Sequence, residues 1–173
     1  MADPNLLIID DRSSGDLRST SGNEWRLVTD SVMGGVTTGR LKITELQDFP
    51  CLRMQGAVSL ENNGGFLQAT LNLPRSVVVN VANYSGFLLQ VYGNNEQYNL
   101  HLRTADTTLP WQSYRASFNA TPKWQELYIP FTDFIPYRID RTLNVKRLTR
   151  IGVVAIGRAF AADLCVGKIA LYK

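Results

Sequence analysis

Alternation of apolar and polar side chains with a period of two residues most constrains what this chain can fold into. Residues 97–104 alternate throughout, with apolar Tyr98, Leu100 and Leu102 set against polar Asn99, His101 and Arg103. Such alternation predicts a β-strand with one buried and one polar face. Residues 66–73 and 112–118 repeat the pattern, and no stretch carries a helical stripe for three turns. The chain is therefore expected to consist mainly of strands.

About eleven short strands follow from this pattern, separated by Gly, Asn, Asp and Pro, which are the usual turn residues. The expected strands span residues 6–9, 24–29, 39–44, 52–59, 66–73, 86–92, 97–104, 112–118, 124–129, 150–157 and 163–172. Many short strands at close spacing are typical of a sandwich or barrel. We predict an all-β jelly-roll β-sandwich of about ten or eleven antiparallel strands, with a short helical turn near residues 131–134 or 140–147.

Length and composition favour one domain. The chain has 173 residues, of which 45% are hydrophobic and 19% charged, values that fit a globular domain and not a disordered chain. It contains no linker or internal repeat, so residues 1–173 are expected to form a single domain. No apolar run is long enough to span a bilayer, and the N-terminus lacks the pattern of a signal peptide. We expect no integral membrane segment and a cytoplasmic location.

The two cysteines, Cys51 and Cys165, match no metal-ligand spacing and no redox pair. Both lie in apolar runs, which favours two buried thiols, with a disulfide as the alternative. Buried thiols would agree with a reducing cytosol. The acidic residues are scattered, so we expect neither a metal site nor a cofactor.

A polar sheet face is the first candidate site. Its residues, if their strands are neighbours, are Gln90, Tyr92, Asn99, His101, Arg103, Ser113, Arg115 and Ser117. Aromatic rings, amides and guanidinium groups together suit a sugar, whereas the ordinary alternative is a solvated outer face. His101 is the only histidine, and no nearby pattern supplies it with a nucleophile and an orienting acid. Catalysis is therefore not predicted.

The loop over residues 30–35 is the second candidate site. It contains Asp30, Ser31, Met33, Gly34 and Gly35 and follows Trp25, which is expected to support it. The glycines permit positive φ angles, and Asp30 and Ser31 can bond their own backbone. A phosphate-binding loop is excluded, since no Gly-Lys-Ser/Thr is present. The loop is either a rigid turn or a partner-docking loop with Met33 at its tip.

Four ordered sequence blocks resemble the complex I intermediate-associated protein 30 family. The first is Trp25 followed by Asp-Ser-Val-Met-Gly-Gly over residues 30–35. The second is Gly-Ala-Val-Ser-Leu-Glu-Asn-Asn-Gly-Gly-Phe over residues 56–66. The third joins Tyr-Arg-Ala-Ser-Phe at 114–118 to Trp-Gln-Glu-Leu-Tyr-Ile-Pro-Phe-Thr-Asp-Phe at 124–134, and the fourth begins Arg-Ile-Gly at 150. Together the blocks span about residues 5–172.

The resemblance implies a galactose-binding-domain-like jelly roll that acts without catalysis. Mitochondrial members assist assembly of respiratory complex I, and photosynthetic relatives act in photosystem II biogenesis through an mRNA. The family has no agreed catalytic residues, so none is carried over. The hypothesis is a non-catalytic assembly or scaffold factor for a membrane respiratory or photosynthetic complex, which binds a protein partner and is peripheral to the membrane through that partner.

Two other partners stay open from the sequence. Carbohydrate would bind the polar sheet face. RNA would bind the basic segment 138–150, which carries five basic residues and one acid but lacks interleaved aromatic residues beyond the adjoining Tyr137.

Overall fold

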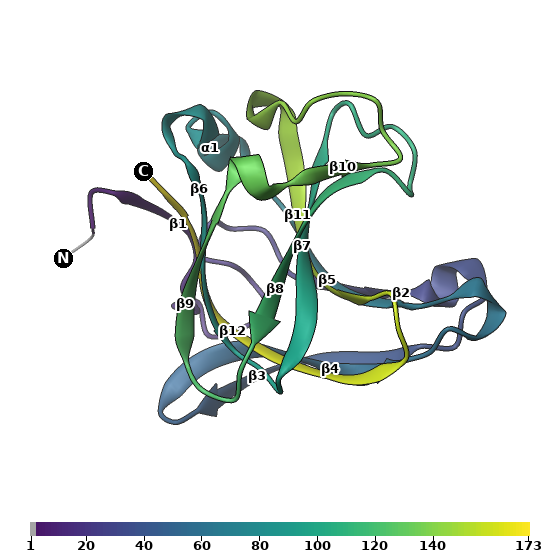
Figure 1. The fold of residues 1–173 in the computed structure, drawn as a ribbon. Helices are drawn as coiled ribbons and strands as arrows, with labels where there is room; N and C mark the ends of the chain where they lie inside the picture. Colours follow the sequence, from purple (N-terminus) through teal and green to yellow (C-terminus); the bar gives the residue numbers. More distant parts are fainter. Residues whose placement is uncertain (1–2) are drawn as a thin grey trace.

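Two antiparallel sheets face each other in the computed structural model, which describes residues 3–173 (Figure 1). The β12 sheet runs in the order β3 (Thr38–Leu46), β4 (Phe49–Val58), β12 (Phe160–Tyr172), β6 (Gly86–Tyr92) and β9 (Gln125–Pro130), and β1 (Leu6–Asp10) also pairs with β12. The β7 sheet runs in the order β10 (Ile135–Tyr137), β8 (Ser113–Ala120), β7 (Glu96–Thr104), β11 (Leu148–Ile156), β5 (Phe66–Asn72) and β2 (Arg26–Thr29). The predicted all-β jelly-roll sandwich is confirmed.

The described residues contain one strand more than expected. Ile-Pro-Tyr at β10 is too short to show alternation, and its central Pro136 lacks the N–H that an inner strand needs, which suits the edge position that it occupies. The helical segments are short, and they are α1 (Arg75–Val78) and the 3-10 turns η1 (Asp30–Met33), η2 (Glu61–Asn63), η3 (Val81–Asn83), η4 (Phe131–Asp133) and η5 (Val145–Arg147). No helix among residues 3–173 has the length and apolar character needed to cross a membrane.

The core fills the space between the sheets. On β7 the apolar set Tyr98, Leu100 and Leu102 points inward and is at most 1% exposed, as the alternation predicts. Because successive side chains point to opposite faces, Asn99, His101 and Arg103 lie on the outer face of the same strand. The outer face of the β7 sheet is therefore the place to look for a site.

The two cysteines form a disulfide, so the expectation of two buried thiols is wrong. Cys51 lies on β4 and Cys165 on β12, which are neighbouring strands, and 114 residues separate them in the chain. Sequence reasoning could not bring them together because nothing local pairs β4 with β12. Disulfides persist mainly in oxidising compartments, so the argument from free thiols for a reducing cytosol no longer holds.

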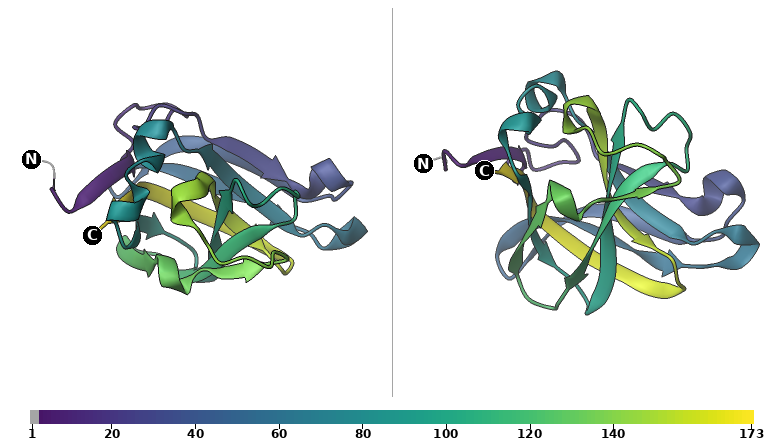
Figure 2. Two further views of the ribbon diagram at one scale, coloured as in Figure 1. Left: turned by 90° about the horizontal axis from the view of Figure 1, so that it is seen from above. Right: turned by 45° about the horizontal axis from the view of Figure 1, so that its top comes forward.

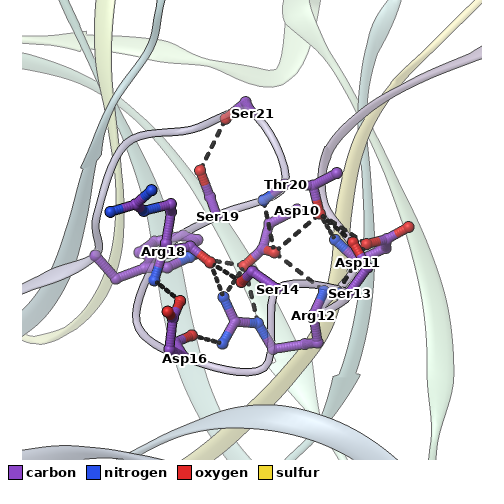
Figure 3. A network of polar contacts seen from close by, with 11 residues as sticks. Asp10, Asp11, Arg12, Ser13, Ser14, Asp16, Arg18, Ser19, Thr20 and Ser21 are labelled. Atoms are coloured by element: carbon purple, nitrogen blue, oxygen red, sulfur yellow. Dashed lines mark hydrogen bonds and ion pairs between the residues drawn. The ribbon is translucent and has the colours of Figure 1, made fainter.

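A buried ion pair fixes the chain between β1 and β2 (Figure 3). The guanidinium of Arg12 donates through Nε and Nη2 to Asp10 Oδ2 at 3.0 and 2.6 Å, and both side chains are at most 4% exposed. The indole Nε1 of Trp25 donates to the same oxygen at 2.7 Å. Trp25 is thus a core residue that ties the start of β2 to the end of β1.

Candidate ligand-binding groove

A groove of about 930 Å³ hollows the outer face of the β7 sheet. Its floor is formed by outward side chains of β5, β11, β7 and β8. One wall consists of η1 and the turn at η2, which project side by side beyond the ends of the sheets (Figure 2). The opposite wall comes from residues 108–112 and from the end of β10, in the upper part of Figure 1.

Strand register orders the floor from a cationic end to an apolar end. Arg150 of β11 lies opposite Arg103 of β7 at the cationic end. Two residues further along β11, Gly152 lies between His101 of β7 and Thr70 of β5, and Arg115 of β8 is the partner of His101 on its other side. At the far end of β11, Ile156 pairs with Phe66 of β5.

Arg103 holds one wall of the groove. Its Nη1 donates to the carbonyl oxygens of Leu109 and Gln112 at 2.8 and 2.9 Å, and its Nη2 donates to that of Thr107 at 2.9 Å. These bonds tie the loop at residues 107–112, which carries the half-exposed Trp111, to β7. Burial and the neighbouring cation of Arg150 lower the pKa of Arg103.

Arg115 retains terminal nitrogens for a ligand. Its Nε donates to Ser113 Oγ at 2.8 Å, and its guanidinium stacks 3.6 Å from the ring centroid of Tyr137. Arg138 approaches the same ring at 5.3 Å. The aromatic ring and the hydroxyl therefore set the position of a guanidinium whose Nη atoms make no hydrogen bond to residues 3–173.

His101 lies at the middle of the floor and is 9% exposed. Burial and the nearby Arg115 cation lower its pKa to about 3, so the imidazole is neutral at pH 7. Its Nε2 is the single buried side-chain nitrogen or oxygen among residues 3–173 that has no hydrogen-bond partner. An unsatisfied buried polar atom costs about 1–3 kcal/mol, which a ligand able to reach this atom would recover.

The η1 wall is held from inside by Asp30, which is fully buried. Its carboxylate accepts from the backbone N–H groups of Thr37, Gly65 and Phe66 at 3.0, 2.6 and 3.3 Å, and from the Thr37 hydroxyl. Burial raises the pKa of this carboxyl, but these hydrogen bonds outweigh it and hold the pKa below its usual range. A Cβ at Gly35 or at Gly64 would come within 2.4 Å of the carboxylate.

The loop residues predicted for partner docking are divided by this arrangement. Asp30 and Trp25 are buried, and they contribute to stability and not to an exposed surface. Ser31, Met33 and Gly34 are exposed, Gly35 is partly exposed, and Met33 with its neighbour Val32 lines the groove.

Of the predicted polar face, the structure brings His101, Arg103 and Arg115 together in the groove, with Ser113 beside them. Asn99 lies on the same face but outside the groove, where it accepts from Ser117 Oγ at 2.7 Å. The placement of Tyr92 and Gln90 on this face is wrong, because β6 belongs to the β12 sheet. Tyr92 instead packs edge-on against Trp124, with 5.7 Å between ring centroids.

Several lining residues escaped sequence reasoning, namely Phe66, Gln68, Thr70, Trp111, Arg150 and Gly152. The alternation at residues 66–73 assigned Gln68 and Thr70 to a polar face, but it could not show that β5 and β7 flank the same strand. The basic segment 138–150 is also split by the fold. Arg141 and Arg147 pair with Asp106 at 3.3 and 3.0 Å, whereas Arg138 and Arg150 line the groove.

Comparison with protein families gives a match to Complex I intermediate-associated protein 30 over residues 16–166. The chain belongs to this family. The matched region includes both walls and the whole floor of the groove. A search of curated proteins finds no match.

Several solved structures with a similar fold are carbohydrate-binding modules. The family 11 module of the cellulase Lic26A-Cel5E of Clostridium thermocellum has a TM-score of 0.77 at 13% identity, over 99% of this chain and 96% of that one. The module in complex with a β-1,3-1,4-mixed-linked tetrasaccharide gives 0.75 at 12%, over 99% and 97%. The family 30 module of Cel9D-Cel44B from Clostridium thermocellum gives 0.57 at 14%, over 77% and 82%. At these identities the likeness establishes the fold.

Proposed function

We propose that this member of the complex I intermediate-associated protein 30 family is a non-catalytic binding module that acts as an assembly or scaffold factor for a membrane respiratory or photosynthetic complex. It holds a protein subunit or assembly intermediate in the groove of the β7 sheet. The module is then peripheral to the membrane through this partner. Family membership supports the class of role, and the groove supports binding as its basis.

The observation that carries the proposal is an exposed apolar wall of the groove. Val32, Met33 and Leu60 are 73%, 61% and 51% exposed, and all three line the groove. Contiguous apolar side chains at the surface mark interaction sites more often than isolated ones do. Their turns are joined by a hydrogen bond from Asn62 Nδ2 to the Gly34 carbonyl at 3.2 Å, so the wall is built before a partner arrives.

The test is a tagged pull-down from the native host, with mass spectrometry at low and high salt. We expect wild-type protein to enrich subunits of one respiratory or photosynthetic complex, and a Met33→Ser, Leu60→Ser variant to lose them. An Ile43→Ser variant is the matched control, since Ile43 is also an exposed apolar residue but lies on β3, at the edge of the other sheet. Equal enrichment by the groove variant and the control would refute the role of the groove.

Carbohydrate binding is the second candidate, and a specific feature of the groove favours it. Trp111 is 55% exposed in one wall, where a pyranose ring could stack, and guanidinium groups and amides on the floor could bond hydroxyl groups. Loss of binding to an array of β-glucans in a Trp111→Ala variant would support it. A folded protein that binds no glycan would remove it.

A further inference from the structure

The groove has a strong imbalance of charge. Four arginines line it, at positions 103, 115, 138 and 150, and none of the lining residues that the structure describes is an Asp or Glu. None of these arginines takes part in an ion pair within residues 3–173. Arg150 lies directly opposite Arg103, an arrangement of like charges that destabilises a sheet. An anion bound here would relieve this repulsion.

The distribution of polarity excludes a ligand that is charged along its whole length. Beyond His101 the floor is mostly apolar, with Val154, Ile156 and Phe66 beside the amide of Gln68, and the wall above it carries Met33 and Leu60. A nucleic acid would place a phosphate over this end. A neutral sugar would bring hydroxyl groups to both ends, and it would leave the arginines without a counter-charge.

The length of the floor sets the spacing of the ligand groups. Arg150 and Ile156 are six positions apart on β11, which at about 3.3 Å per residue corresponds to about 20 Å. The row that contains Arg115 and Gly152 lies four positions from Ile156, or about 13 Å. An extended peptide of about six residues spans the same distance.

We propose that the groove binds an extended acidic segment of a protein partner, with carboxylates at Arg115, Arg138 and Arg150 and an apolar side chain between Met33, Leu60 and Phe66. The carboxylates lie four to six residues from the apolar anchor. Arg103 is a positioning residue, since its donors hold the loop at residues 107–112. Beside His101, the side chain of Gln68 takes the space above Gly152, with Oε1 3.0 Å from where a Cβ would stand, so a peptide backbone meets the Gln68 amide there. This inference rests on the proposed function.

The probe is a fluorescein-labelled peptide in which a spacer of four Gly and Ser residues separates two leucines from two glutamates. Its binding to the full chain is measured by fluorescence anisotropy. We expect binding that weakens with added salt, and about tenfold weaker binding when glutamines replace the glutamates. Arg115→Gln should weaken binding by about tenfold. Arg40→Gln should leave binding unchanged, because this substitution removes the same charge from an exposed position on β3, in the other sheet.

Met33→Ser tests the apolar end independently. It should weaken binding of the leucine peptide but not binding of a peptide with serines in place of the leucines. Equal binding of the glutamate and glutamine peptides would overturn the proposal, as would the absence of binding to folded protein. Preference for an oligouridylate or a mixed-linked β-glucan oligosaccharide over the peptide would overturn it in favour of that ligand. If the peptide fails but the pull-down depends on the groove, the function stands and the peptide chemistry falls. If the peptide binds but the pull-down enriches no complex subunit, the peptide chemistry stands and the assembly function falls.

Discussion

Replacing Asp30 by asparagine tests whether the buried carboxylate holds the η1 wall. Oδ1 accepts the Thr37 N–H, while Oδ2 accepts the Gly65 and Phe66 N–H groups and the Thr37 hydroxyl. An asparagine has one accepting oxygen, so in either orientation its NH₂ group faces at least one buried N–H donor. The substitution preserves shape, which leaves hydrogen bonding and charge as the variables.

The expected loss is about 3 kcal/mol of the free energy of unfolding. A buried donor left unsatisfied costs about 1–3 kcal/mol, and the remaining bonds lose the strength that the negative charge supplies. For a chain of this size a loss of 1 kcal/mol lowers Tm by about 2–4 °C, so Tm should fall by about 6–12 °C.

Thermal unfolding followed by circular dichroism at pH 7 measures this difference. Glu45→Gln is the control, because it removes one negative charge from an exposed position on β3. The pKa of Asp30 is lowered in the folded protein, so its contribution is present above the ordinary value of 3.8 and is lost as the pH falls through the folded value. The gap between wild type and Asp30→Asn should therefore stay constant from pH 7 to about 5 and close in stronger acid. A decrease in Tm of less than about 2 °C, or an equal decrease in the control, would refute the reasoning.

Three further predictions concern the frame and the floor. Cys51→Ser with Cys165→Ser should lower the free energy of unfolding by about 2–5 kcal/mol, since the bond closes a loop of 114 residues. In calorimetry, the loss of stability that reductant causes in wild type should equal the loss in this variant. Arg12→Met leaves the buried carboxylate of Asp10 without its cation and should cost about 3–5 kcal/mol in urea unfolding; a change below about 1 kcal/mol would contradict a buried ion pair. Because the folded pKa of His101 is about 3, the unfolded chain takes up a proton near pH 6.5 before the folded chain does, so stability should decline between pH 6.5 and 4 more steeply in wild type than in His101→Gln.

The strands were predictable because their evidence is local. Alternation within residues 97–104 separates Leu100 and Leu102 from His101 and Arg103 without reference to any other part of the chain, and the structure places these pairs on opposite faces. By contrast, the order of strands in a sheet depends on contacts between distant segments. For this reason the prediction that places Tyr92 on the polar face is wrong.

The groove was predictable only in part for the same reason. The four charged or polar groove residues that sequence reasoning found, His101, Arg103, Ser113 and Arg115, lie on the adjacent strands β7 and β8, which follow each other in the chain. Arg150 and Gly152 come from β11, more than thirty positions later, and the wall residue Leu60 comes from before β5. The disulfide between Cys51 and Cys165 belongs to the same class of long-range contact.

The structure explains the paired glycines at residues 34–35 and 64–65. Gly34 and Gly65 adopt positive φ angles of 84° and 134°, while Gly35 and Gly64 leave the space that the Asp30 carboxylate fills. The first block thus meets the second at one buried carboxylate. A wall held in this way keeps the exposed Met33 in position before binding, which reduces the conformational entropy that a partner must offset. Asp30→Asn should therefore weaken binding of the leucine–glutamate peptide even at temperatures where the variant is fully folded, because the peptide dissociates faster from the apolar end.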